Sequence, residues 1–193
     1  YLHEIGRVPL LTGAEEKSLA KQMEEGRRVS EIKEEWLRQH GRPPSAPEIM
    51  LVIAKDLCQS TPIITVIQKE VGLKRTATFL GAMSNTKFRN AIDGDIKPEF
   101  ILSLANKIEK SVPETEQLIT NLSINMNLMP KQVFGVINDS ICTADIDKLT
   151  EDAAVMKSVQ AYSDQLQTYF DNIEATSEKA KSHLIEANLR LVV

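Results

Sequence analysis

A cluster of four basic side chains stands out in this sequence as a possible binding site. Lys74, Arg75, Lys87 and Arg89 lie in a stretch that contains no acidic residue. Such a cluster forms either an ordinary solvated face or a patch for nucleic-acid phosphates or an acidic protein surface. The residues alone leave both interpretations open.

No arrangement typical of an enzyme accompanies this cluster. The sequence has no Gly-rich phosphate loop, no Gly-x-Ser-x-Gly elbow and no His-Glu-x-x-His motif. Asp93 and Asp95 flank a glycine, but further ligands do not follow at calcium-loop spacing, which favours a capped turn. Three unpaired histidines argue against a His-rich site, and two cysteines exclude a four-thiolate zinc site. We therefore predict a non-enzyme without metal or cofactor.

The elements that would position these residues are predicted to be helices throughout, which makes the fold class all-α. Capping boxes occur at Thr12…Glu15, Ser45…Glu48 and Ser111…Glu114, each ahead of an apolar stretch. Residues 63–67 are β-branched and suit a strand, but no partner strand with alternation is evident, so a helix is expected there. The predicted helices cover 13–25 with a stop at Gly26, 29–39, 47–58, 62–71, 85–92, 98–109, 113–126 and 130–140.

The C-terminal segment has a different pattern. Apolar residues recur at three- and four-residue steps and predict one long amphipathic helix, which either continues or breaks near Ser177. These residues are Val155, Val159, Tyr162, Leu166, Tyr169 and Ile173. Residues 180–193 are apolar on two sides, so one side is expected to pack on this chain and the other on something outside it.

Composition narrows the function classes. The chain has 193 residues, 42% of them hydrophobic and 26% charged, as expected for one globular domain or a domain with a large insertion. Its longest aliphatic run, 49–54, is far short of the roughly 20 residues of a membrane span, so no membrane association is predicted. A net charge of −4 argues against freestanding non-specific nucleic-acid binding. Because the chain begins without Met and stops within an apolar run, we expect a segment of a longer cytoplasmic protein.

The two ends of the chain contain the most specific motifs. The first twelve residues, YLHEIGRVPLLT, followed by Glu15-Glu16 and Leu19-Ala20, closely resemble region 1.2 of the primary (housekeeping) bacterial sigma factors. Ala180 and then HLIEANLRLVV, residues 183–193, look like the opening of region 2.1. The resemblance implies three segments: region 1.2 at 1–26, a non-conserved helical insert at 27–176, and the start of region 2.1 at 177–193.

The resemblance also implies a role and partners. Sigma factors bind core RNA polymerase, including its β′ subunit, recognise promoters and help open the duplex, so the expected location is the cytoplasm, at the nucleoid. Tyr1, Leu2 and His3 would contact the non-template strand in the discriminator. The matched positions for a pocket that holds a flipped thymine of the −10 element are Leu10, Glu16, Asn188 and Leu191. An Asn amide can pair with a base edge, and Leu can contact the thymine methyl group.

An alternative gives the insert its own role. It would be a helical protein-interaction module that binds polymerase or a regulator and has no DNA contact of its own. Its surface would be the exposed side of the 155–173 helix or the basic cluster at 74–89. In the family, the main polymerase-binding helix and the promoter-melting aromatics follow region 2.1. We therefore expect this chain alone not to bind promoter DNA measurably.

Overall fold

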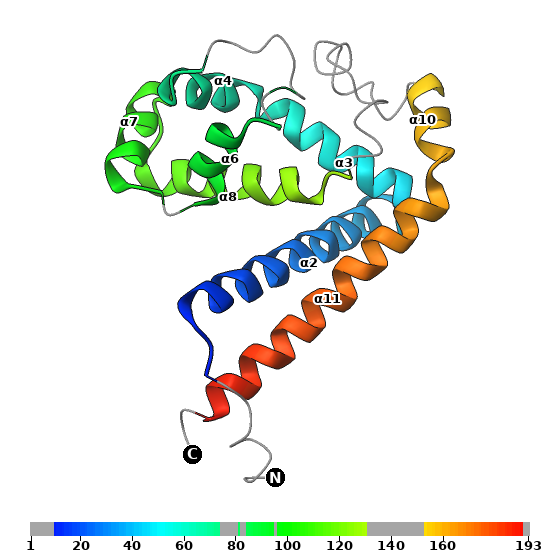
Figure 1. Ribbon diagram of the computed structural model, residues 1–193. Coiled ribbons are helices and arrows are strands. Elements are labelled where there is room, and N and C mark those ends of the chain that lie inside the picture. The colour runs from blue at the N-terminus through cyan, green and yellow to red at the C-terminus, as the bar shows by residue number, and fades with distance from the viewer. Residues whose placement is uncertain (1–9, 74–80, 82–83, 95, 131–152, 191–193) are drawn as a thin grey trace. The chain divides into compact units, whose positions relative to one another are not determined.

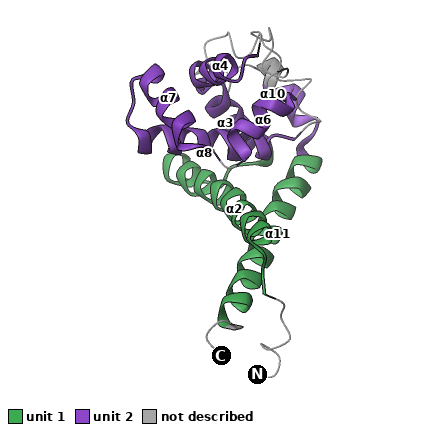
Figure 2. Ribbon diagram, turned by 60° about the vertical axis from the view of Figure 1, so that its left-hand side comes forward, with its two compact units in different colours: residues 1–46, 164–193 green, residues 47–163 purple. Residues whose placement is uncertain are grey.

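The described part of the chain is helical, which confirms the all-α fold class. The computed structural model describes residues 10–73, 81, 84–94, 96–130 and 153–190, without the side chains of 153–155 and 190, and no strand occurs among them. The chain forms two compact units, one of residues 1–46 and 164–193 and the other of residues 47–163 (Figures 1 and 2).

The first unit is built on two long helices, α2 (Gly13–His40) and α11 (Ser163–Arg190), which lie side by side in Figure 1. Each has 28 residues and is therefore about 42 Å long. The predicted capping box starts α2: Thr12 Oγ1 accepts from the Glu15 N–H at 3.3 Å, and Glu15 Oε2 accepts from the Thr12 N–H at 2.7 Å. The helix ends at Gly41, whose φ of 69° is left-handed and suits glycine.

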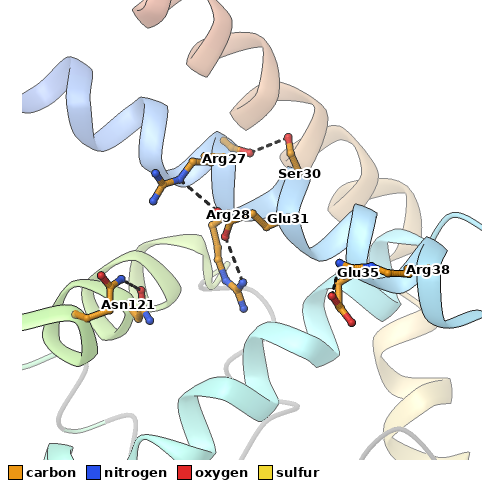
Figure 3. Close-up of polar contacts among 9 residues, drawn as sticks. Arg27, Arg28, Ser30, Glu31, Glu35, Arg38 and Asn121 are labelled. Carbon is orange, nitrogen blue, oxygen red and sulfur yellow. Dashed lines mark hydrogen bonds and ion pairs between the residues drawn. The ribbon is translucent and has the colours of Figure 1, made fainter. Parts of the chain in front are cut away.

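The predicted helix stop at Gly26 is wrong. Instead of two helices, 13–25 and 29–39, α2 runs without a break through Gly26, which is buried. Ion pairs one turn apart follow Gly26 within the same helix, with Arg27 Nε 3.4 Å and Arg28 Nη1 3.6 Å from the Glu31 carboxylate (Figure 3). The glycine therefore serves packing rather than termination, as shown below.

The second unit contains the shorter helices, and its core lies among them. Helices α6 and α7 pack on α8, and α4 packs on both α6 and α7. Fully buried side chains from four of these helices include Ile67, Phe88, Leu104 and Leu122. The helices are α3 (Ala46–Gln59), α4 (Thr61–Glu70), α6 (Thr86–Asp93), α7 (Pro98–Ile108), α8 (Val112–Leu128) and α10 (Ala153–Gln160).

Most predicted helices of this unit are confirmed within one or two residues. The β-branched stretch 63–67 is helical, and it buries Ile63, Ile64 and Ile67 on one side of α4. The capping box of Ser111 and Glu114 starts α8, with the Glu114 carboxylate 3.0 Å from the Ser111 N–H. The helix expected over 130–140 lies outside the described residues, apart from Pro130.

The long C-terminal stripe is confirmed as amphipathic but divides into two helices. The chain leaves α10 at Gln160 and enters α11 at Ser163, so the break comes at Ala161–Tyr162 and α11 continues through Ser177. Of the predicted stripe, Val159 and Leu166 are buried, whereas Tyr162, Tyr169 and Ile173 are half-buried. Phe170, which is not part of the stripe, is also buried.

Within the described residues, no single helix is long and apolar enough to cross a membrane. Helices α3 and α4 would reach that length together, but they are bent by 53° relative to each other.

Candidate nucleic-acid interface

Contacts along α2 and α11 establish that the two helices are antiparallel. Lys33 on α2 reaches Glu174 on α11, with its Nζ atom 2.8 Å from both carboxylate oxygens. Nearer the start of α2, Gly26 lies against Ser177, whose Oγ donates to the carbonyl of Met23 at 3.5 Å. Residues nearer the start of α2 thus contact residues nearer the end of α11. The beginning of α2 and the last turns of α11 therefore lie at the same end of the pair.

Charges on one helix affect ionisable groups on the other. The backbone N–H and the hydroxyl of Thr12 lower the pKa of the Glu15 carboxyl, and nearby His183 on α11 lowers it further. Further along the pair, burial raises the pKa of the Tyr169 phenol on α11, and the negative charge of Glu25 on α2 adds to this. At both places, a charge on one helix therefore shifts the pKa of a group on the other helix.

Three of the predicted DNA-contacting residues lie at this end of the pair. Leu10, two residues before the N-cap of α2, is 56% exposed, and Glu16 is exposed in the first turn. Asn188 is exposed in the last turn of α11. Leu191, together with Tyr1, Leu2 and His3, lies outside the described residues. The thymine pocket as a whole therefore stays a prediction.

The last turns of α11 have one covered side and one open apolar side. Ala180 and Ala187 are buried, at 2% and 3% exposure, and Leu184 is half-buried. Ile185 is 52% exposed and Leu189 is 40% exposed. The prediction that one side of this segment packs on the chain itself is confirmed.

The described groups at this end include acidic, amide and apolar side chains. Glu15 and Glu16 form an acidic first turn, which repels a phosphate backbone. A neutral amide such as that of Asn188 can pair with a base edge, and an exposed leucine such as Leu10 can contact a thymine methyl group. Both kinds of group are present among the described residues at this end.

The basic cluster is only partly within the described residues. Lys74 and Arg75 lie outside them. Lys87 is exposed on α6, whereas Arg89 makes a 2.8 Å ion pair with Asp93 and donates to the side chain of Asn127. The charge of Arg89 is thus compensated within the second unit, and a phosphate-binding or protein-binding patch stays a prediction.

A groove of about 660 Å³ runs between α2 and α11 over the Gly26–Ser177 contact. Its walls include Ala20, Met23, Ser177 and Leu184.

Sequence reasoning missed the residues that join α2 and α11, namely Gly26, Ser177, Lys33 and Glu174. The available signal was a glycine inside a helical pattern, which can mark a close approach of two backbones as well as a helix end.

The described residues contain no group of three or more His, Cys, Asp or Glu side chains that could hold a metal ion.

Comparison with known proteins places a family match at the beginning of the chain. Residues 1–28 match the family model described as Sigma-70 factor, region 1.2. This match supports membership of the sigma-70 family, which is a non-enzymatic family of transcription factors. It also supports a role in transcription initiation. No curated protein matches the chain. No solved structure matches it either.

Proposed function

We propose that this chain is a segment of a primary sigma factor that directs core RNA polymerase to promoters. Residues 1–26 would be region 1.2, residues 27–176 the non-conserved helical insert, and residues 177–193 the start of region 2.1. The observation on which the proposal depends is that the helix that begins within the region 1.2 match pairs, antiparallel, with the helix that contains the region 2.1-like motif.

The proposed mechanism is sequence-dependent stabilisation of single-stranded promoter DNA. Tyr1, Leu2 and His3 contact the discriminator of the non-template strand. Extruding the last thymine of the −10 element costs a few kcal/mol of lost pairing and stacking, which a shaped pocket must offset. The pocket residues are Leu10, Glu16, Asn188 and Leu191.

The spacing of these residues supports such a pocket. Asn188 and Leu191 are three residues apart, as neighbours on one helix face are. Glu16 is held in the first turn of α2, which the capping box of Thr12 and Glu15 fixes. Because the first turn of α2 and the last turn of α11 share an end of the pair, both sets of side chains can reach one base.

The proposed partners are core RNA polymerase and the non-template strand of promoter DNA. The acidic first turn at Glu15 and Glu16 and the net charge of −4 leave few phosphate contacts. Affinity for DNA would therefore come mainly from polymerase and from the rest of the sigma factor, while these residues supply the choice of base. Such a protein works in the cytoplasm, at the nucleoid.

Substitutions in the full-length protein, bound to core polymerase, test the proposal. Asn188→Ala and Leu10→Ala should each weaken binding of a −10 oligonucleotide about tenfold, a typical cost for one base contact. The loss should disappear when the last thymine is replaced by an abasic site. Asn172→Ala and Leu37→Ala are matched controls, since both residues are exposed on the same two helices.

If the Asn188 and Leu10 variants bind thymine-containing and abasic oligonucleotides in the same ratio as the parent protein, these residues do not contact the flipped base.

A further inference from the structure

Gly26 lies at a close approach of α2 to α11. A Cβ atom placed on Gly26 would come within 3.0 Å of both the Cβ and the Oγ of Ser177, closer than real Cβ atoms approach. A glycine inside a helix costs about 1 kcal/mol relative to alanine, so its position in the middle of α2 calls for a compensating gain. Close packing against Ser177 is such a gain.

A second contact joins α2 and α11 further along α2. Lys33 lies about two turns beyond Gly26 on α2, and Glu174 lies three residues before Ser177 on α11. Their two 2.8 Å contacts join the helices on one side of the close approach. The two helices are thus in contact at two places along their length, at Gly26 and Ser177 and at Lys33 and Glu174.

The proposed thymine pocket lies on the other side of this contact. Glu16 is ten residues before Gly26, roughly 15 Å along α2, and Asn188 is eleven residues after Ser177, roughly 17 Å along α11. Both stretches are uninterrupted helix, so they behave as stiff rods over this length. We therefore expect a change of spacing at the contact to alter the distance between the side chains at the end of the pair.

We propose that Gly26 and Ser177 are positioning residues that set the separation of α2 and α11, and through it the width of the thymine pocket. The inference rests on the proposed function. It adds a residue pair that touches no DNA but determines how well the pocket distinguishes thymine from other bases.

The test uses the full-length protein bound to core polymerase and measures a ratio. The ratio compares affinity for a −10 oligonucleotide ending in thymine with affinity for one ending in cytosine. Gly26→Ala should lower this ratio about threefold or more, because the added Cβ pushes the helices apart. Ser177→Gly in the same chain should restore the ratio, since it removes the overlapping atoms.

Two controls separate spacing from general damage. Gly26→Ala with Ser177→Ala should not restore the ratio, because alanine keeps the Cβ that collides. Gly13→Ala, at a glycine with open space around it, should leave the ratio unchanged. Should Gly26→Ala fail to fold, Ser177→Thr adds bulk from the other helix and has the same expected effect.

The outcomes are distinguishable from those of the proposed function. A parent protein that discriminates thymine, combined with an unchanged ratio in folded Gly26→Ala, overturns the positioning role alone. A ratio that falls but is not restored by Ser177→Gly also overturns it. A parent protein without any thymine preference removes the proposed function, and this inference with it.

Discussion

Lys33 Nζ lies 2.8 Å from each carboxylate oxygen of Glu174, although the two residues are 141 positions apart in the chain. The contact joins the helix that begins within the region 1.2 match to the helix that contains the region 2.1-like motif. Segments that are remote in sequence are therefore held in one compact unit by defined side chains rather than by general apolar packing alone.

Breaking this ion pair should cost little stability but should show coupling. Both side chains are 32% exposed, so solvent screens the interaction, and we expect a coupling free energy of up to about 1 kcal/mol. Urea unfolding of Lys33→Ala, Glu174→Ala and the double variant measures it as a double-mutant cycle. The more exposed pair Lys181–Glu178, at 3.9 Å, is the control and should show no coupling. Equal coupling in both pairs would contradict the expectation.

Two leucines on α7 should differ sharply when truncated. Leu104 is fully buried, whereas Leu102 is 53% exposed two residues earlier. Leu104→Ala should lower the free energy of unfolding by about 2–5 kcal/mol, because it leaves a cavity as well as losing apolar burial. Leu102→Ala should change it by less than about 0.5 kcal/mol. Thermal or urea unfolding of the two variants checks the difference, and similar losses would mean that the core is misplaced.

The N-cap of α2 should control local opening next to the proposed pocket. Thr12→Ala removes the hydroxyl that accepts from the Glu15 N–H and should destabilise the first turn by about 1 kcal/mol. Amide hydrogen exchange should therefore speed up over residues 13–17 and remain unchanged near Gly26. Thr65→Ala, which removes a mid-helix hydroxyl bonded to the Thr61 carbonyl, is the control. Unchanged exchange in the first turn would refute the role of the cap.

Glu70 should make the second unit sensitive to acid. The Lys107 ammonium and then the Ser103 hydroxyl, 2.8 Å away, hold the pKa of Glu70 below its ordinary value of 4.5. Because the folded pKa is depressed, the stabilisation is present above about pH 4.5 and is lost as pH falls through the lower folded value. Glu70→Gln should lower stability at pH 7 and flatten the loss between pH 5 and 3, as followed by urea unfolding. Glu116→Gln, on an exposed position of α8, is the comparison.

The 193-residue chain alone should not bind promoter DNA tightly. Its net charge of −4 and the acidic first turn of α2 leave few phosphate contacts. A fluorescence titration with a −10 oligonucleotide should show no saturation below micromolar concentration. Sub-micromolar binding would show that this chain contains a DNA site of its own.

The sequence predicted local structure well because local signals determine it. Thr12 and Ser111 stand at helix starts with a glutamate three residues on, and both caps form as expected. The β-branched run in α4 is helical because Ile63, Ile64 and Ile67 share one buried side, which outweighs their strand propensity. The start of α11 was harder to place, since the stripe continues in phase across the break at Ala161–Tyr162.

Long-range contacts could not be predicted from local patterns. Gly26 satisfies the rule for a helix end as well as the rule for a close approach, and only the presence of Ser177 across from it distinguishes them. Arg89 belongs to the predicted basic cluster because no acid occurs between positions 74 and 92, yet Asp93, one turn later on α6, pairs with it. The resemblance at the two ends predicted which segments belong together but not which side chains join them.

The distance in sequence between α2 and α11 has a consequence for synthesis. A ribosome that adds about 5–20 residues per second needs roughly 6 to 25 s to go from the end of α2 to the start of α11. During that interval Gly26 and Lys33 are already translated and have no partner helix. The second unit can complete its own core in this interval. It can therefore fold before α2 and α11 are able to pair.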